Sequence, residues 1–470
     1  MRMKVPVYLS LLLLFVLYPK FAVSQKQDKR PNIIFIITDD QQTGLLGVEG
    51  NTTANTPHID RIGEEGVVFK NAFVVTPLCS PSRASFLTGN YAHKHNVINN
   101  DKLGLDVISH TLLTWPRQLR KSGYVTAFIG KWHMGLDDSR RPGYDRWFSF
   151  KGQGDYIDGV VNDEDTRIQT TGYMTDIINE KALTFLKNHN QNLPFAMIIA
   201  HKAVHWPLLP AKRHGSLYPD FKFDSIAVHE NDITGKPHLR STVDRKKFYE
   251  YQNVLPEPPE SRRGRGRERD AIVGDQHRSL KSVDDGVGEL FKTLEKKDLL
   301  ENTVIIYVSD NGMLMGEHGE FNIKRWAYDP VIRIPMLMRY PPLIKPKSTR
   351  EQMVLNIDIA PTLLKLANVA PLEPMDGESL VPILKEPKTE GRKAFLAEYF
   401  LEKVAPRVRP WKAVRTKKWK YIEYSEDGMA AELYNLETDP SETFNLINES
   451  SLKVQVDKLK QLMRGFLSER

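Results

Sequence analysis

Short, continuous apolar runs that alternate with helix-like segments are the feature that most limits how this chain can fold. Residues 32–38 read NIIFIIT, a β-branched run without the in–out alternation of a strand that has one face in water, so we expect a strand buried on both faces of a parallel sheet. Similar runs occupy residues 125–129, 195–200 and 304–308. Helix candidates lie around residues 111–122, 173–188 and 282–295. This alternation predicts an α/β domain with a large, mostly parallel sheet flanked by helices.

Polar side chains follow each of the four runs directly. They are Asp39 and Asp40 after the first, the segment 130–133 after the second, the segment 201–205 after the third, and Asp310 with Asn311 after the fourth. Ligands of such sheets bind beyond the carboxyl ends of the strands. The sequence therefore predicts that the four clusters meet in one site.

Two regions depart from this pattern. Residues 231–270 are polar and very basic at 262–267, which predicts a long loop or insertion. From about residue 380 the chain changes to short strands and turns, with a hairpin expected at 411–424, a strand at 431–436 and a closing amphipathic helix at 452–467. We therefore predict a large N-terminal domain over 25–379, which carries the four polar clusters, and a smaller C-terminal α+β subdomain over 380–470.

The N-terminal residues have the form of an export signal. Arg2 and Lys4 precede an apolar stretch at 5–17, and 22–24 read Ala-Val-Ser, a small-x-small cleavage site. We predict a signal peptide over 1–24 and a periplasmic or secreted protein without stable membrane insertion; the alternative is an uncleaved anchor. Removing 1–24 takes away three basic residues and no acid, which lowers the formal net charge from +7 to +4. That mild excess suits an anionic partner but does not indicate nucleic-acid binding.

The chain has a single cysteine, Cys79. Exported proteins usually use cysteines in disulfides, so an unpaired one is an inert buried thiol, a cross-link between chains or a reactive centre. Pro81 is suited to the first residue of a helix and Gly89 to its end. Cys79 would then lie at a helix N-terminus, where free N–H groups favour a bound anion.

The acidic residues at the strand ends indicate a metal. Adjacent carboxylates such as Asp39 and Asp40 repel each other unless a cation lies between them, although a helix cap or a solvated turn would also explain the pair. Asp310 and Asn311 add a carboxylate and an amide oxygen. Four hard oxygen ligands favour Ca²⁺ or Mg²⁺ over zinc.

The string Cys-x-Pro-x-Arg-Ala-Ser-x-Leu-Thr-Gly at 79–89 resembles the formylglycine-dependent sulfatases. The resemblance covers nearly all of the mature chain, from residue 32 to about residue 440. It implies an alkaline-phosphatase-like sulfatase fold and a sulfuric ester hydrolase. It also implies that a separate modifying enzyme converts Cys79 to formylglycine (3-oxoalanine), whose hydrate is the nucleophile. The segments around 74–79 and 91–100 resemble the branch of glucosamine-6-sulfatases, heparan endosulfatases and bacterial polysaccharide sulfatases.

The same resemblance assigns roles to residues that match the family's motifs. It implies one Ca²⁺, or Mg²⁺, held by Asp39, Asp40, Asp310, Asn311 and residue 79. Lys131 and Lys324 would contact the sulfate, with Arg83 balancing its charge. His133 would accept a proton beside the nucleophile, and His205 would protonate the leaving alcohol. Other substrate contacts are expected from His201, His318 and Glu320. The chain departs from the pattern at Val204, often proline in this branch, and at Asp329, usually glutamate.

The expected function is thus an exported, calcium-dependent sulfatase acting on a sulfated polysaccharide, oligosaccharide or glycosaminoglycan, and lysosomal if the source is an animal. A phosphomonoester or phosphonate hydrolase of the same fold is the nearest alternative, because phosphate resembles sulfate in shape. An alternative of another class is a sulfated-glycan binding protein that is never converted at Cys79. The basic run at 262–267 would suit that role as well as it suits an enzyme.

Overall fold

The structure, a computed structural model, describes residues 30–100, 104–219, 221, 235–236, 238–239, 269–406, 408–425 and 430–468. The predicted signal peptide and the basic run at 262–267 lie outside these residues, as does most of the predicted insertion. Within the described residues, no helix combines the length and the apolar character that crossing a membrane requires.

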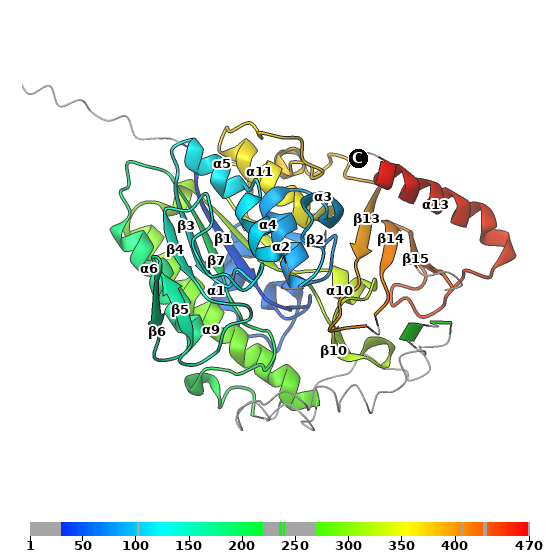
Figure 1. The fold of residues 1–470 in the computed structure, drawn as a ribbon, viewed down its shortest axis with the longest axis horizontal. Helices are drawn as coiled ribbons and strands as arrows, with labels where there is room; N and C mark the ends of the chain where they lie inside the picture. The colour runs from blue at the N-terminus through cyan, green and yellow to red at the C-terminus, as the bar shows by residue number, and fades with distance from the viewer. Residues whose placement is uncertain are drawn as a thin grey trace, which may run out of the picture.

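A large mixed sheet forms the centre of the molecule (Figure 1). In the described part of the chain it has ten strands in the order β12-β2-β11-β8-β1-β7-β3-β4-β5-β6. Its inner strands β8, β1, β7, β3 and β4 are parallel, whereas β11, β5 and β6 run antiparallel to their neighbours. The bounds are β1 Asn32–Thr38, β2 Val67–Phe73, β3 Val125–Gly130, β4 Arg146–Ser149, β5 Val160–Asp163, β6 Thr166–Gln169, β7 Phe195–Ala200, β8 Thr303–Ser309, β11 Met336–Arg339 and β12 Ser348–Leu355. The predicted mostly parallel sheet is confirmed.

Helices cover both faces of this sheet. Successive side chains of a strand point to opposite faces, so Phe35 packs with α2 (Cys79–Thr88), α5 (Trp115–Lys121) and α11 (Ile359–Leu366). Ile36 faces the other way, toward α1 (Pro57–Glu64), α6 (Met174–Asn188) and α9 (Arg269–Lys296). Figure 1 shows these two helical layers on either side of the strands. Burial on both faces explains why β1 is apolar from Ile33 to Ile37.

Two of the predicted helices differ in extent from the prediction. The segment 111–122 is divided: α4 (Leu105–Thr111) ends at its start, and α5 begins again at Trp115. Thr114 caps α5, with Pro116 in its first turn, where a missing N–H costs nothing. The helix expected at 282–295 is the second half of α9, which begins at Arg269.

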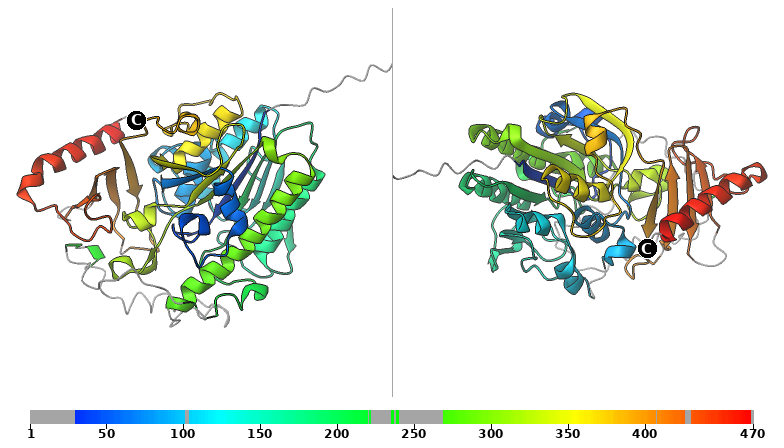
Figure 2. Two further views of the ribbon diagram at one scale, coloured as in Figure 1. Left: turned by 180° about the vertical axis from the view of Figure 1, so that it is seen from behind. Right: turned by 90° about the horizontal axis from the view of Figure 1, so that it is seen from above.

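The C-terminal part forms a four-stranded antiparallel sheet over the described residues, in the order β13-β14-β15-β16. Its strands are β13 Ala394–Tyr399, β14 Trp411–Thr416, β15 Trp419–Tyr424 and β16 Glu432–Asn435. The helix α13 (Lys453–Ser468) lies along this sheet, as Figure 2 shows. Leu380, Ile383 and Leu384, the first residues of the predicted subdomain, pack into the large domain's core instead. The small sheet itself packs on Trp326 and Tyr328 of the large domain.

The remaining short elements lie in the connections. They are η1 Gly47–Glu49, α3 Ala92–His95, η2 Lys212–His214, η5 Leu300–Asn302, β9 Leu314–Met315, η6 Glu317–Gly319, β10 Phe321–Ile323, α10 Asp329–Ile332, η7 Asn356–Asp358, α12 Val381–Lys385 and η8 Ser450–Leu452.

Candidate active site

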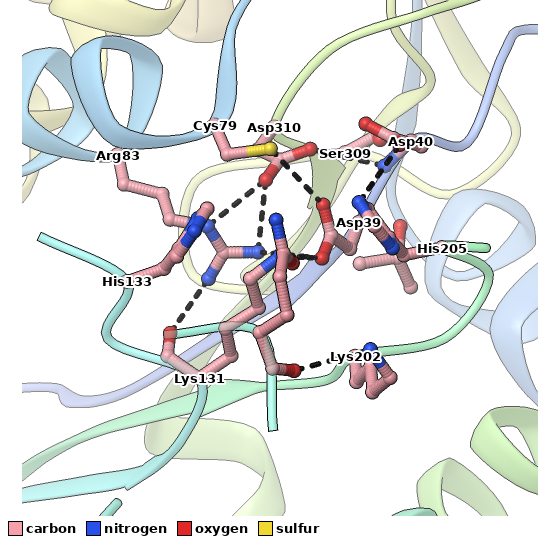
Figure 3. A network of polar contacts seen from close by, with 12 residues as sticks. Asp39, Asp40, Cys79, Arg83, Lys131, His133, Lys202, His205, Ser309 and Asp310 are labelled. Carbon is pink, nitrogen blue, oxygen red and sulfur yellow. Dashed lines mark hydrogen bonds and ion pairs between the residues drawn. The ribbon is translucent and has the colours of Figure 1, made fainter. Parts of the chain in front are cut away.

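The ends of neighbouring strands bring the predicted acidic residues together. β1 and β8 are paired in parallel with Thr38 opposite Ser309, so the residues that follow them are neighbours. The Asp310 N–H donates to the Thr38 carbonyl (3.0 Å), and the Asp40 N–H donates to Asp310 Oδ1 (3.0 Å). The strand register therefore fixes these carboxylates relative to one another (Figure 3).

Cys79 lies at the N-terminus of α2, as predicted, but the expected helix start at Pro81 is wrong. The helix begins at Cys79, with Leu78 as its N-cap, and Pro81 is its third residue. A proline fits there because N–H groups in the first turn have no partner within the helix. Cys79 is fully buried, and burial raises the pKa of its thiol to about 12. The unmodified residue is therefore a neutral thiol at neutral pH.

The side chains of three aspartates and of Cys79 lie close together in the protein interior. Ligand atoms of Asp39, Asp40 and Asp310 lie within 4.8 Å of one another. Cys79 Sγ is 3.6 Å from Asp39 Oδ1. Asn311 donates from Nδ2 to Asp40 Oδ1 (2.8 Å), while its buried Oδ1 has no hydrogen-bond partner among the described residues. Burial, together with the charge of Asp39, raises the pKa of Asp310 to about 7. This oxygen-rich donor set, with one oxygen unsatisfied, fits a hard divalent cation.

Basic side chains surround these carboxylates. The Arg83 guanidinium contacts Asp310 Oδ2 through Nε and Nη2, both at 2.9 Å, and donates from Nη1 to the Lys131 carbonyl (2.7 Å). Lys131 Nζ contacts Asp39. Lys324 Nζ is 2.5 Å from Asp40 Oδ1 and 2.7 Å from Cys79 Sγ. Although burial alone would raise the pKa of Asp39, Lys131 and the other cations outweigh it and hold that pKa well below its usual range.

Two histidines border the cluster. His205 Nε2 is 3.6 Å from Asp40 Oδ2, and its Nδ1 is 2.7 Å from the Trp206 carbonyl oxygen. A carbonyl oxygen can only accept, so Nδ1 carries a hydrogen and Nε2 faces the site. Burial lowers the pKa of His205 to about 3, and burial with the Lys131 charge lowers that of His133. His133 Nδ1 is buried without a hydrogen-bond partner in the described part of the chain.

The other two predicted histidines lie deeper in the protein. His201 is 1% exposed, and burial lowers its pKa to about 3. His318 is also 1% exposed and packs on the ring of Tyr328, with 4.4 Å between ring centroids. Neither ring presents surface for a substrate in this arrangement, and their proposed contacts remain predictions. Glu320 is likewise largely buried.

Sequence reasoning missed a further pair beside Lys131. Gln153 Oε1 accepts a hydrogen bond from Lys131 Nζ, and its backbone oxygen accepts one from Lys202 Nζ (3.2 Å). Lys202 is 4% exposed, and burial followed by the Lys131 charge lowers its pKa to about 8. Lys202 belongs to the strand-end cluster 201–205, so its position could have been recognised. Gln153 lies in an irregular segment after β4, and no sequence pattern marks it.

Sequence families account for nearly all of the described chain. Residues 31–369 match the family described as Sulfatase. Residues 316–468 match the family described as N-sulphoglucosamine sulphohydrolase, C-terminal.

Individual relatives agree with these matches. The N-acetylglucosamine-6-O-sulfatase of Bacteroides thetaiotaomicron is 32% identical over 93% of this chain and 86% of that protein. The human N-acetylglucosamine-6-sulfatase is 31% identical over 89% of this chain and 81% of its own. A solved structure of a complex with its substrate D-glucosamine-2-N,6-O-disulfate has a TM-score of 0.79 at 30% identity, covering 93% of this chain and 97% of that one. The phosphonate monoester hydrolase of Agrobacterium radiobacter, at 18% identity, shares the fold over 94% of this chain and 96% of its own, with a TM-score of 0.75.

Proposed function

The chain belongs to the sulfatase family and is a sulfuric ester hydrolase, and we propose that it uses residue 79, converted to formylglycine, and a calcium ion to remove sulfate from a carbohydrate. The proposed sugar is a glucosamine sulfated on O6, within an oligosaccharide or a glycosaminoglycan. This choice is supported by two relatives above 30% identity that are glucosamine 6-sulfatases, and by the related structure that holds a 6-O-sulfated glucosamine. We also propose that the protein is exported, because its first residues have the form of a signal peptide.

The cation would be held by Asp39, Asp40, Asp310 and Asn311 together with residue 79. When present, the hydrated aldehyde would supply a nucleophilic oxygen and the cation would polarise the sulfate. Magnesium would satisfy the same oxygen donors, whereas zinc prefers nitrogen and sulfur. The support is the close approach of three buried carboxylates and the unsatisfied Asn311 Oδ1.

The basic residues would bind the sulfate and offset the charge that develops on its oxygens. Lys324 Nζ contacts both Asp40 and the side chain of residue 79, so it lies where a sulfuryl group would approach that residue. Lys131 Nζ is held by Asp39 and Gln153. Preorganised charges in a buried site of this kind contribute strongly to catalysis because they need not reorient during the reaction.

The two histidines would carry the protons. His205 Nε2 would donate a proton to the leaving sugar oxygen, which is a poor leaving group as an alkoxide. The pKa of His205 lies near 3 in the free protein because of burial, so the bound sulfate anion must favour its charged form for this role. His133, whose Nδ1 has no hydrogen-bond partner in the described structure, would accept a proton from residue 79.

The observation that carries this proposal is the position of Cys79. The sole cysteine of the chain is buried between Asp39 and Lys324, beside two further carboxylates. A thiol that served only for packing would need neither a lysine nor a set of metal-ligating oxygens around it. A nucleophile that attacks an anionic ester needs both.

Sulfate release from defined sugars tests the proposal. We would co-express the enzyme with a formylglycine-generating enzyme and measure sulfate released from glucosamine 6-sulfate, glucosamine 3-sulfate and a uronic acid 2-sulfate. The account predicts release from the 6-sulfate first, and loss of all release in Cys79→Ala. A preference for a phosphonate monoester would instead favour the alternative that shares this fold. Preference for another sulfated position would contradict the proposed sugar.

A further inference from the structure

The C-terminal sheet binds the segment that carries Lys324. Trp411 Nε1, on β14, donates to the carbonyl oxygen of Arg325 (2.8 Å). Lys420 Nζ, on β15, donates to the carbonyl oxygen of Ala327 (3.0 Å). The small sheet therefore holds the backbone immediately after the lysine that contacts Cys79.

One residue of the small subdomain contacts two segments that flank Cys79. Glu402, which follows β13, has a fully buried side chain. Its carboxylate accepts hydrogen bonds from Arg325 Nε and from the Asn100 N–H (3.1 Å). The Tyr399 hydroxyl also donates to it (3.4 Å). A single buried carboxylate thus joins two segments that are far apart in sequence.

Each of these segments makes a hydrogen bond at Cys79 or at the residue that follows it. Arg325 is the neighbour of Lys324, whose Nζ is 2.7 Å from Cys79 Sγ. Asn100 accepts, through Oδ1, a hydrogen bond from the N–H of Ser80, the residue after Cys79 (3.0 Å). Glu402 therefore connects to both sides of the nucleophile without contacting it.

The contact between Glu402 and Arg325 helps to hold an unusual backbone conformation at Arg325. Arg325 has φ +85°, a left-handed backbone conformation that residues other than glycine rarely adopt. Such conformations persist where surrounding contacts hold them. At Arg325 those contacts are the Trp411 indole on the carbonyl and the Glu402 carboxylate on the side chain. The direction of the Lys324 side chain depends on that backbone.

We propose that Glu402 is a positioning residue for the sulfatase reaction, which fixes Lys324 and the first turn of α2 against each other through Arg325 and Asn100. The inference rests on the role of Lys324 proposed above. It gives the C-terminal subdomain a part in turnover, although no residue of that subdomain is needed to touch the sulfate.

Glu402→Gln tests the inference with a minimal change of shape. Arg325 Nε donates to Oε2 of Glu402, whereas the Asn100 N–H donates to Oε1. A glutamine amide keeps only one of these two oxygens, so it can accept from Arg325 or from Asn100 but not from both. Glu398→Gln is the matched control, because Glu398 is also buried and lies on β13, four residues earlier. Oε1 of Glu398 accepts from both the N–H (3.1 Å) and Nδ1 (2.9 Å) of His93. Oε2 of Glu398 is 3.0 Å from the same Nδ1. Because that nitrogen carries a single hydrogen, one acceptor oxygen can serve both donors of His93.

We would measure kcat and KM on an aryl sulfate, per converted residue 79, for Glu402→Gln and Glu398→Gln. Both would be made in the wild-type and the Lys324→Ala backgrounds, with the melting temperature of each variant. Loss of a residue that orients a catalytic group typically costs roughly 10–100-fold in activity. We expect that loss in kcat for Glu402→Gln and less than about threefold for Glu398→Gln. In the Lys324→Ala background, Glu402→Gln should lose much less, because part of its effect passes through Lys324.

Three results would overturn the inference. If Lys324→Ala is impaired while Glu402→Gln turns over like Glu398→Gln, Glu402 does not position the site. If the loss of kcat in the double variant equals the product of the losses in Glu402→Gln and Lys324→Ala, Glu402 does not act through Lys324. If Lys324→Ala keeps full activity, the proposed role of Lys324 fails and this inference fails with it.

Discussion

Individual residues of the site balance one another's charge. Asp39, Asp40 and Asp310 are almost fully buried, and an isolated buried carboxylate would be very unfavourable. Each is paired with a cation, Lys131, Lys324 or Arg83 respectively. The same cations are those expected to bind the sulfate. Although burial opposes it, Lys131 and the other cations hold the pKa of Asp39 well below its usual range, whereas burial and the charge of Asp39 raise the pKa of Asp310 to about 7.

His205 and Lys131 can be separated by the choice of leaving group. A sugar hydroxyl needs a proton as it leaves, whereas an activated phenolate does not, so His205→Ala should lose about 10²–10⁴-fold on the sugar sulfate and far less on an aryl sulfate. Lys131→Ala should lower kcat/KM by equal factors on the sugar sulfate and on the aryl sulfate, because the charge on the sulfuryl group is the same in both. Parallel kcat/KM measurements on the two substrates would check this. Equal losses for His205→Ala would remove it from the acid role.

Removal of the cation should affect both stability and turnover. A chelator should lower activity and the melting temperature, because binding to the folded state stabilises it, and Ca²⁺ or Mg²⁺ should restore both, but not Zn²⁺. Asp310→Ala should be inactive, with a melting temperature that no longer responds to Ca²⁺. A chelated enzyme that keeps full activity and an unchanged melting temperature would refute the metal assignment.

At the scale of elements, the ends of strands β1, β3, β7 and β8 carry most of the site. These were the elements that the sequence identified, because burial on both faces leaves a long apolar run that ends abruptly in polar residues. β2 and β12 were missed because their sequences, VVFKNAF and STREQMVL, place polar residues within the strand. The role of Glu402 could not be predicted from the sequence either, since its partners Asn100 and Arg325 contact it only in the folded structure.

Gly130 at the end of β3 is predicted to be essential for placing Lys131. It has φ +117°, and a Cβ there would lie 1.9 Å from the Ala200 carbonyl oxygen, which accepts the Lys131 N–H (2.8 Å). Gly130→Ala should therefore lower both the melting temperature and activity. Gly44→Ala is the matched control, since Gly44 also has positive φ (+84°) but a Cβ there would meet nothing within 4 Å.

Gly44→Ala should lower the free energy of unfolding only by the strain of a left-handed alanine, about 1–2 kcal/mol, and should not lower turnover. Gly130→Ala adds the clash with β7 to that strain. Equal effects of the two substitutions on melting temperature and activity would show that the contact at Ala200 is unimportant.

At the scale of the whole molecule, buried ion pairs join helix α10 of the large domain to the C-terminal sheet. Asp329, at the start of α10, is paired with Arg415 (2.9 Å) and Lys420 (2.6 Å) of the C-terminal sheet. Lys420 is fully buried and also contacts Glu442 (2.5 Å). Because the segment between Lys324 and Asp329 lies at this junction, the stability of the interface and the geometry of the site depend on the same contacts.

Lys420→Met should therefore destabilise the protein strongly. It leaves Asp329 and Glu442 buried with less compensating charge, and breaking a buried pair typically costs about 3–5 kcal/mol. Lys418→Met, two residues earlier, removes an exposed pair with Glu437 and should change stability by less than about 1 kcal/mol. Thermal melting of the two variants compares them directly. Similar melting temperatures would contradict the structural role given to Lys420.

The central claim is that residue 79, buried among the carboxylates and lysines, becomes the nucleophile by conversion of its thiol to an aldehyde. The mass of the tryptic peptide spanning residues 71–83, taken from an enzyme preparation of measured specific activity, tests it most directly. The account predicts that the peptide carries formylglycine at residue 79 and that specific activity rises in proportion to the converted fraction. An intact thiol at residue 79 throughout a fully active preparation would contradict it.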